Sequence, residues 1–572
     1  MLPQYAAAAA LEAHLGDPRD PAATLSFARS VALDEREAFP QESVDALVSW
    51  GYLRQMVPVA DGGRLASFEE ALWLQRCVSR RDLTTAIALG QTFLGTVAVW
   101  LAGTPAQRAR TAEALLQGRL AALALTEEEH GSDVLASSMT AFREPGGLRV
   151  RGRKWLINNA TRGTLLTLFA RTTPEGGLHG CSLLLLDKEQ VDGAALHPLP
   201  KLPTHGIRGA DISGILVDGA LLPEGALIGP EHAGAEVLLQ GLQLTRTACA
   251  GFSLGAADTA LRLALDFARG RRLYGQTVLD LPHARAQLAG CFADLLLCDA
   301  LATVGARAIQ AAPEQLSLWS SVVKYLVPVT CERVIREAAV VLGARHYLRD
   351  HAAGAFQKLL RDAAVVSLFD GSTAVNLDAI GAQLPRLSPA RAATPEERAR
   401  TLTLLCSLTA TLAPLEPARL ALVNAGRDDL TQGLPETVTL LRGLGGAPAA
   451  ALLPLAERLA RALETLSVEV AALASRERSA MKRSPELFSL AARFANLSAG
   501  AAVLHLFVRS RGQLDAFFED DAWPAVCLAR ALGEPASPAH LAVLAERMTS
   551  LHAEERAFAL NGLPLGRGAQ LP

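Results

Sequence analysis

The chain is 572 residues long and carries a formal net charge of −3 at pH 7. A nucleic-acid partner would usually need a concentrated basic face, so this balanced charge argues against that class of partner. Hydrophobic residues make up 50% of the chain and charged residues 20%. This length and this mixture predict a globular, mostly helical protein with several domains.

The sequence contains neither an evident membrane span nor a secretory signal. Apolar runs are interrupted before they reach the roughly eighteen residues that a membrane span needs. The best candidate, Ala86 to Ala102, contains two glycines and several polar residues. The first residues, MLPQYAAAAALEAHLGD, lack a cationic start and include Glu12. We therefore expect a cytoplasmic protein.

The eight cysteines are scattered along the chain, without a CxxC pair and without neighbouring histidine ligands. Zinc sites and disulfide frameworks both need closely spaced or paired cysteines. The pattern therefore predicts reduced, mostly buried thiols and no metal site.

Residues 1–118 are predicted to form an N-terminal helical domain. Thr104 and Pro105 suit the N-cap and the first position of a helix, because Thr accepts a free amide and Pro loses no hydrogen bond there. The stretch from Leu83 to Leu101 is apolar on nearly all sides, so we expect it to lie at the centre of this domain.

Residues 119–229 are predicted to form a β module between two helical blocks. Turn pairs such as Gly176-Gly177 and Asp218-Gly219 separate its short apolar runs, because glycine accepts the positive φ of tight turns. The predicted strands cover residues 121–126, 148–153, 164–171, 181–187 and 212–218.

Helical periodicity returns in residues 230–385, as expected of a bundle of long helices. The predicted helices cover Glu236–Arg269, His283–Ala311 and Leu316–Val341. A proline-rich linker begins at Leu384 and ends in a capping box formed by Thr394 and Glu397. Residues 386–572 are predicted to form a further helical domain, in which no cluster of titratable residues indicates a site.

Two short sequences in the β module have the residue types of a ligand-binding site. One is Thr126-Glu127-Glu128-Glu129-His130-Gly131-Ser132-Asp133, and the other runs from Lys154 to Ala160 with two adjacent amides, Asn158 and Asn159. Loops at strand ends can present amides and hydroxyls to a bound cofactor. Each sequence alone could also be an ordinary solvated turn.

More motifs follow at wide spacing. They are Lys201–Gly229 with Arg208, Gly209 and Pro223 at fixed positions, Leu242–Arg246, Arg269–Gly275, Val341–Tyr347, Leu360–Ala363 and Phe369–Thr373. Together with the domain order, these motifs resemble the acyl-CoA dehydrogenase superfamily of flavoproteins over roughly residues 30 to 385. The resemblance implies an α+β, mostly α fold: an N-terminal helical domain, a middle β-barrel domain, a C-terminal four-helix bundle and an extra helical tail, as in the longer members.

The resemblance implies FAD as the cofactor. The implied cofactor-binding residues are Thr126, Gly131, Ser132, Leu156, Asn158, Arg271, Tyr274, Gly343 and Ser372. Asn158 replaces the hydroxyl residue that the family places beside flavin N5. Arg271 matches an arginine that reaches the FAD pyrophosphate, often across a subunit boundary, although a cation at a helix end also has a purely structural explanation. Near Gly343 the family's glycine-rich turn is largely lost.

The turn Phe369-Asp370-Gly371-Ser372 resembles the family's catalytic turn, in which a glutamate stands at the position of Asp370. By resemblance, Asp370 is the base that removes the α proton of an acyl thioester. Asp is shorter than Glu by one C–C bond, about 1.5 Å, so the substrate must lie closer or present its proton differently. Ser132, Arg246 and Gly371 are implied to border the substrate. An Asp-Gly turn without chemistry is the alternative interpretation.

The leading interpretation is FAD-dependent α,β-dehydrogenation of an acyl-CoA or a carrier-bound acyl group, with electron-transfer flavoprotein or a similar electron acceptor. The changes at Asn158, Asp370 and Ala374 leave open a flavin oxidase or monooxygenase acting on a non-CoA substrate. The altered turn at Gly343 leaves open a non-catalytic family member. The resemblance also implies a homodimer, with a tetramer as the alternative.

Overall fold

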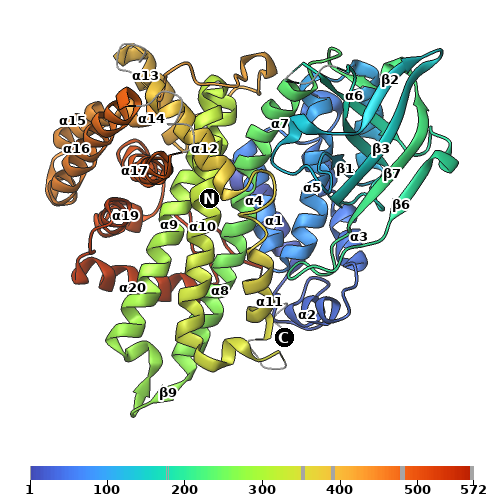
Figure 1. Ribbon diagram of the computed structural model, residues 1–572. Helices are drawn as coiled ribbons and strands as arrows, with labels where there is room; N and C mark the ends of the chain where they lie inside the picture. The colour runs from blue at the N-terminus through green and yellow to red at the C-terminus, as the bar shows by residue number, and fades with distance from the viewer. Residues whose placement is uncertain are drawn as a thin grey trace. The chain divides into compact units, whose positions relative to one another are not determined.

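The computed structural model describes residues 2–174, 177, 179–349, 354–387, 393–476 and 484–566 (Figure 1). Its contacts divide the chain into two compact units, each assembled from separate stretches of sequence. The sheet unit contains Ala28–Ala66 and Asp82–Thr245, and the bundle unit contains Met1–Phe27, Ser67–Arg81 and Arg246–Pro572. The predicted turn residue Gly176 lies outside the described residues.

The sheet unit is built on one mixed sheet of eight strands. The strands are β1 (Ala121–Ala124), β2 (Thr140–Glu144), β3 (Gly147–Asn158), β4 (Leu165–Arg171), β5 (Cys181–Asp187), β6 (Leu196–Leu199), β7 (Ile212–Leu222) and β8 (Leu227–Ile228). Their order is β6-β7-β3-β2-β4-β5-β8, and β1 pairs in parallel with β4. All five predicted strands are present, whereas the short strands β2, β6 and β8 were not predicted.

Helices complete the sheet unit. They are α2 (Phe27–Glu35), α3 (Gln41–Trp50), α5 (Leu83–Ala102), α6 (Pro105–Leu116) and most of α7 (Gly234–Ala248). Helix α5 packs against β1, and a Cβ on Gly95 would meet the backbone nitrogen of Ala122 at 2.5 Å, so only glycine permits this approach. The predicted N-cap of α6 is confirmed as a capping box between Thr104 and Gln107.

The bundle unit contains three long helices that lie side by side, α8 (Ala250–Gly270), α9 (Pro282–Ala311) and α10 (Leu316–Leu342) (Figure 1). Helices α9 and α10 match their predicted ranges within one residue at each end. The prediction of one helix over Glu236–Arg269 was wrong, because Cys249 separates α7 from α8. The other helices of this part are α1 (Ala6–Leu15), α4 (Phe68–Ser79), α11 (Gly354–Ala363) and α12 (Thr373–Gln383).

The tail helices belong to the bundle unit. They are α13 (Pro395–Cys406), α14 (Asp429–Gln432), α15 (Leu434–Leu444), α16 (Gly446–Arg476), α17 (Pro485–Arg509), α18 (Ala516–Glu519), α19 (Ala522–Leu532) and α20 (Pro538–Ala553). Four of them, α13, α17, α19 and α20, pack against α9 (Figure 1). The capping box between Thr394 and Glu397 at the start of α13 is confirmed.

Buried charges connect the end of the described chain to the bundle helices. The Arg76 guanidinium donates to Asp299 at 2.7 Å and lies 3.6 Å from an oxygen of Asp258. The backbone amides of Phe558 and Leu560 donate to Asp258 and Asp299, at 2.7 and 2.9 Å respectively. Each buried carboxylate is therefore satisfied by both a cation and a backbone amide, as buried charge requires.

Three helices, α5, α9 and α17, are by length and composition apolar enough to cross a membrane. In the structure 78%, 100% and 72% of their respective apolar windows are buried. The expectation from sequence that no stretch is apolar enough for a membrane span was therefore wrong by length and composition.

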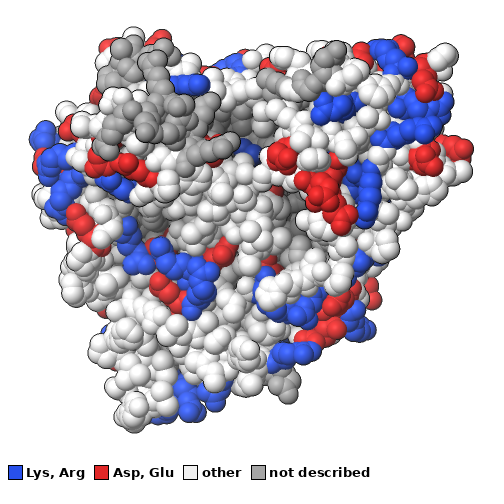
Figure 2. All heavy atoms as spheres, viewed as in Figure 1, with Lys and Arg blue, Asp and Glu red and all other residues white. Residues whose placement is uncertain are grey.

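All eight cysteines are free and buried, which confirms the predicted state of the thiols. On the face drawn in Figure 2, basic and acidic side chains lie in small mixed groups with uncharged surface between them. Charges of both signs therefore alternate over this face.

Candidate active site

The predicted catalytic turn joins α11 to α12 in the bundle unit. Its backbone is left-handed at two successive residues, with φ values of 56° at Asp370 and 97° at Gly371. A Cβ on Gly371 would meet the Arg246 guanidinium at 3.0 Å, so both the conformation and the space favour glycine. The Ser372 hydroxyl accepts from the amide of Val375 and caps α12.

Side chains from three helices hold this turn by its backbone carbonyls. Arg246 of α7 donates from Nε to the carbonyl of Asp370 at 3.0 Å. Lys324 of α10 donates from Nζ to the carbonyls of Val366 at 2.7 Å and Gly371 at 3.1 Å. Asn376 of α12 donates to the carbonyl of Gly371 at 2.8 Å. The turn is therefore fixed in part by helices that are distant from it in sequence.

The carboxylate of Asp370 is half-buried and contacts a thiol. Cys249 donates from Sγ to Oδ2 of Asp370 at 3.6 Å. Burial, together with the negative charge of Asp370, raises the pKa of the Cys249 thiol well above its usual range, so the thiol stays protonated. Burial lowers the pKa values of Lys324 and Arg246, and the nearby carboxylate of Asp370 opposes this shift.

Sequence reasoning singled out Asp370, Gly371, Ser372 and Arg246, and the structure brings these four residues together. It missed Lys324 and Cys249. The sequence did contain a signal for Lys324, since this charged residue lies within the apolar helix Leu316–Leu342. An ammonium group is rarely buried without a specific partner.

In the sheet unit, the loop at 126–133 follows β1 and is tied to β3. The Lys154 ammonium is buried and donates to Oε1 of Glu127 and to the carbonyl of Leu125, both at 2.8 Å. Burial disfavours the Glu127 carboxylate, but hydrogen bonds from Lys154, Ser137 and Ser138 outweigh this effect and lower its pKa to about 2. This acidic loop is therefore not simply a solvated turn.

The backbone also brings the first two sequence motifs together. The amide of Trp155 donates to the carbonyl of Thr126 at 3.0 Å. Thr126 is half-buried, whereas Gly131 and Ser132 are exposed further along the loop. The hydroxyl of Ser132 is therefore available to solvent or to a ligand.

The second motif contains a β-bulge and a buried amide. The register of β3 against β7 shifts between Trp155 and Ile157, and Leu156 between them has a φ of 58° and is 46% exposed. Both side-chain polar atoms of Asn158 are buried and have no hydrogen-bond partner among the described residues. A buried amide without a partner is costly, and the polar edge of a flavin would satisfy both its donor and its acceptor.

Two other predicted residues lie at an exposed hairpin formed by β9 (Arg272–Leu273) and β10 (Gln276–Thr277). Figure 1 shows this hairpin at one end of the bundle. Tyr274 at its tip is 92% exposed, and the Arg271 guanidinium is exposed and makes no hydrogen bond or ion pair with the described residues. Such an arginine is free to bind phosphate oxygens.

Gly343 follows α10, where it starts the short helix Gly343–Tyr347. Its φ is 58°, and a Cβ built on it meets no atom within 4 Å. Glycine is therefore favoured here by backbone conformation and not by close packing.

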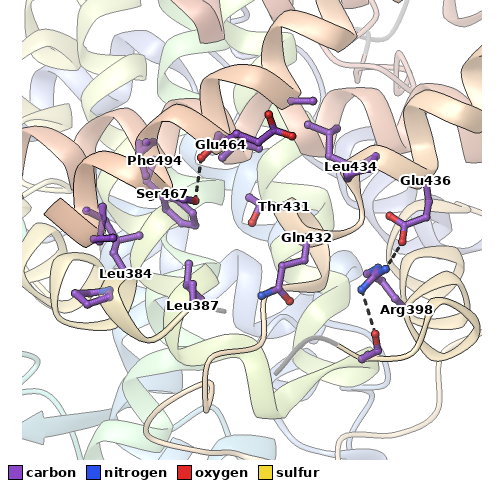
Figure 3. Close-up of a pocket in the computed structure, with 18 of the residues that line it drawn as sticks. Leu384, Leu387, Arg398, Thr431, Gln432, Leu434, Glu436, Glu464, Ser467 and Phe494 are labelled. Atoms are coloured by element: carbon purple, nitrogen blue, oxygen red, sulfur yellow. Dashed lines mark hydrogen bonds and ion pairs between the residues drawn. The ribbon is translucent and has the colours of Figure 1, made fainter. Parts of the chain in front are cut away.

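A separate pocket of about 570 Å³ lies among the tail helices (Figure 3). Leu384, Leu387 and Phe494 line one side, and the ion pair of Arg398 with Glu436 lies at the other (Figure 3). Its lining residues include none of the predicted site residues. Over the described ranges, no three His, Cys, Asp or Glu side chains are grouped so that they could hold a metal ion.

Models of three protein-family domains match this chain. The acyl-CoA dehydrogenase N-terminal domain matches residues 24–119, the middle domain matches residues 122–220 and the C-terminal domain matches residues 232–384. Together they cover more than half of the chain.

Individual proteins are also similar. Cyclohex-1-ene-1-carbonyl-CoA dehydrogenase of Geobacter metallireducens is 26% identical over 363 residues, covering 62% of this chain and 93% of that protein. The butyryl-CoA dehydrogenase structure from Megasphaera elsdenii is 21% identical, with a TM-score of 0.62, over 68% of this chain and 99% of that one. The acyl-CoA dehydrogenase of Bacillus anthracis, solved with FAD, is 18% identical with a TM-score of 0.71 and covers 96% of this chain and 88% of its own. This last match extends over the tail helices.

Proposed function

This chain belongs to the acyl-CoA dehydrogenase family, a family of FAD-dependent oxidoreductases, and we propose that it catalyses α,β-dehydrogenation of an acyl thioester with Asp370 as the base. The predictions of the family, of its fold with extra C-terminal helices, of the enzyme class and of FAD as the family's cofactor are confirmed at this level. The observation that carries the proposal is the Asp370-Gly371 turn held by Arg246 and Lys324.

In the proposed reaction, the α C–H bond of the thioester breaks and its proton passes to the Asp370 carboxylate, while a C=C bond forms between the α and β carbons. FAD, when bound, supplies the two-electron acceptor for the β hydrogen. Arg246 and Lys324 keep the turn fixed while the proton is transferred to the Asp370 carboxylate, because each donates to a backbone carbonyl of the turn. A fixed base avoids the loss of rate that comes from small errors in position.

Nine residues are proposed to contact FAD. In the sheet unit these are Asn158, with its buried unpaired amide, Leu156 at the bulge, and Thr126, Gly131 and Ser132 on the loop. In the bundle unit these are Arg271, Tyr274, Gly343 and Ser372. Arg271 fits the role of a phosphate ligand because its guanidinium is exposed and unpaired among the described residues, whereas the Ser372 hydroxyl is already used as a helix cap.

The substrate is proposed to be an acyl-CoA, with a carrier-bound acyl group as the alternative. Two similar proteins bear the name cyclohex-1-ene-1-carbonyl-CoA dehydrogenase, from Geobacter metallireducens and Syntrophus aciditrophicus. Because Asp370 reaches less far than a glutamate, a ring that presents its α proton at a fixed angle is a reasonable substrate class. Ser132, Arg246 and Gly371 are proposed to border the thioester.

We further propose a cytoplasmic homodimer, with a tetramer as the alternative, that passes electrons to an electron-transfer flavoprotein or a similar acceptor. The exposed Arg271 beside the hairpin, which has no partner among the described residues, supports a site completed by a second copy. One similar structure, 19% identical with a TM-score of 0.61, bears the name electron transferring flavoprotein of Acidaminococcus fermentans.

The test is an anaerobic titration of the flavin-loaded protein with a panel of straight-chain and cyclic acyl-CoAs, following the absorption of oxidised flavin. We expect at least one thioester to bleach the wild-type flavin and none to bleach Asp370→Asn, which keeps the shape of the side chain but cannot accept the proton. Equal bleaching of the variant would refute Asp370 as the base. A wild-type flavin that stays oxidised against the whole panel would refute the proposed reaction.

A second candidate is a flavin oxidase or monooxygenase. It is favoured by Asn158, whose buried amide stands where the family has a hydroxyl residue. Turnover of the wild type in air with formation of hydrogen peroxide would select it over the dehydrogenase. A protein purified without bound flavin, and unable to take it up, would select the non-catalytic alternative.

A further inference from the structure

Cys249 marks the break between α7 and α8, where the helical periodicity of the sequence continues without interruption. It is 121 residues before Asp370, yet its sulfur lies 3.6 Å from Oδ2 of that residue. No feature of the sequence connects these two side chains. Their contact is a property of the folded bundle.

The thiol differs from the other groups around the turn in the atom that it contacts. Arg246 and Lys324 are also titratable groups close to Asp370, and both donate to backbone carbonyls of the turn. Cys249 instead donates to the carboxylate itself. Its hydrogen bond therefore acts directly on the rotation of the carboxylate about its terminal bond, a torsion that is intrinsically broad in aspartate.

The thiol is also in the correct protonation state for this role. A thiol is a donor only while it is protonated. Cys249 is 3% exposed, and burial beside a carboxylate raises its pKa and keeps the proton on its sulfur. Its neighbour Phe252 packs against Phe369 with ring centroids 6.4 Å apart, so the start of α8 and the turn are in direct contact.

We propose that Cys249 is a positioning residue that orients the Asp370 carboxylate toward the α proton of the substrate. The inference rests on the proposed function, because only a catalytic Asp370 gives this orientation a consequence. A short side chain tolerates little error in direction, so fixing the carboxylate compensates for the reach lost relative to a glutamate.

The test compares Cys249→Val, Cys249→Ser and the control Cys406→Val, in flavin-loaded protein. Valine fills the space of the thiol but cannot donate, and serine restores a donor. Cys406 is a buried thiol on α13 and is not part of the proposed site. The first readout is the pH profile of flavin reduction by a thioester under single-turnover conditions. A donor to the charged carboxylate lowers the pKa of a base.

We expect Cys249→Val to move the ascending limb of this profile to higher pH by about half a unit to one unit, the effect of losing one hydrogen bond. Cys249→Ser should move it back toward the wild-type position, and Cys406→Val should leave it unchanged. The affinity for the thioester should change much less than the reduction rate, because the proposed role of the thiol involves the base and not the substrate.

The second readout is the S–H stretching band, obtained as the infrared difference between wild type and Cys249→Val. In an Asp370→Asn background the band should shift to higher frequency, because a neutral amide oxygen is a weaker acceptor. An unchanged pH profile in Cys249→Val, or an unshifted band, would overturn the inference while the dehydrogenation stands. A wild type whose flavin no thioester reduces would instead overturn the proposed function, and with it the role of the thiol.

Discussion

Replacing Lys324 by methionine tests whether the catalytic turn depends on a buried cation. Lys324 is 1% exposed, and methionine has a similar length and fills the same space without a charge. The variant removes the hydrogen bonds to the carbonyls of Val366 and Gly371 and the contact with the Phe369 ring, whose centroid lies 5.4 Å from Nζ.

The substitution leaves the carbonyls of Val366 and Gly371 with different numbers of hydrogen bonds. Gly371 keeps a hydrogen bond from Asn376 at 2.8 Å, whereas Val366 loses the donor that satisfies it. An unsatisfied buried carbonyl costs about 1–3 kcal/mol, and loss of a cation–π contact adds about 0.5–1 kcal/mol. Part of this free-energy cost is offset in the methionine variant, because no charged group is buried any longer. We therefore expect a net local destabilisation of about 1–3 kcal/mol.

The assay is hydrogen exchange of the turn, followed by mass spectrometry. The amide of Thr373 donates to the carbonyl of Ser367 at 3.1 Å and reports whether the turn is closed. A destabilisation of this size accelerates exchange roughly 5- to 150-fold. Lys188→Met is the matched control, since Lys188 also donates to two backbone carbonyls but lies in the sheet unit. Unchanged exchange in Lys324→Met, or an equal change in the control, would refute the reasoning.

Three further predictions concern conformation and pH. Gly371→Ala should destabilise the turn by about 1–3 kcal/mol and slow flavin reduction, because the new Cβ meets Arg246 at 3.0 Å and φ is positive. His505 is buried, and desolvation is the main cause that lowers its pKa to about 3. The stability gained by keeping this histidine neutral is lost as pH falls from about 6.5 toward 3. His505→Gln should therefore lose less stability than the wild type over this pH range in acid unfolding. The pKa of Glu127 is lowered from 4.5 to about 2, so its charged form contributes stability that is present above pH 4.5 and lost toward pH 2. Glu127→Gln should remove this contribution. The variant should also make Lys154, which loses its ion-pair partner, faster to acetylate chemically.

Each of these has an outcome that contradicts it. Wild-type reduction kinetics in Gly371→Ala would mean that the turn has room for a methyl group. An acid transition of His505→Gln that overlays the wild type would mean that this histidine is not held neutral. Unchanged acid stability in Glu127→Gln would mean that its hydrogen bonds contribute nothing to the pH dependence.

The long elements were predictable from the sequence because their signals are local. Helix α9 has Pro282 at its first position, and both α9 and α10 keep apolar residues at helical spacing to the end, so their bounds follow from the pattern. The break at Cys249 could not be predicted, because no proline marks it and Cys249 itself has helical dihedral angles. Strands β6 and β8, with four and two residues, are too short to show a period.

Residues of the candidate site could be predicted only where they are adjacent to one another in the sequence. Asp370, Gly371 and Ser372 follow one another, and their turn was located from that order alone. Lys324 and Cys249 reach the turn across 47 and 121 residues of sequence, respectively, and a single sequence carries no record of such pairings. The predicted roles of the site residues remain predictions until the flavin titration tests them.

The two carboxylates on α8 and α9 also bear on how the protein is made. Asp258 and Asp299 receive the amides of Phe558 and Leu560, which are separated from them by 300 and 261 residues. While the chain emerges from the ribosome at about 5–20 residues per second, these acids and Arg76 exist for tens of seconds before their last partners are synthesised. These buried charged groups must stay hydrated during that interval, so the final packing of the bundle around them waits until Phe558 and Leu560 have been synthesised.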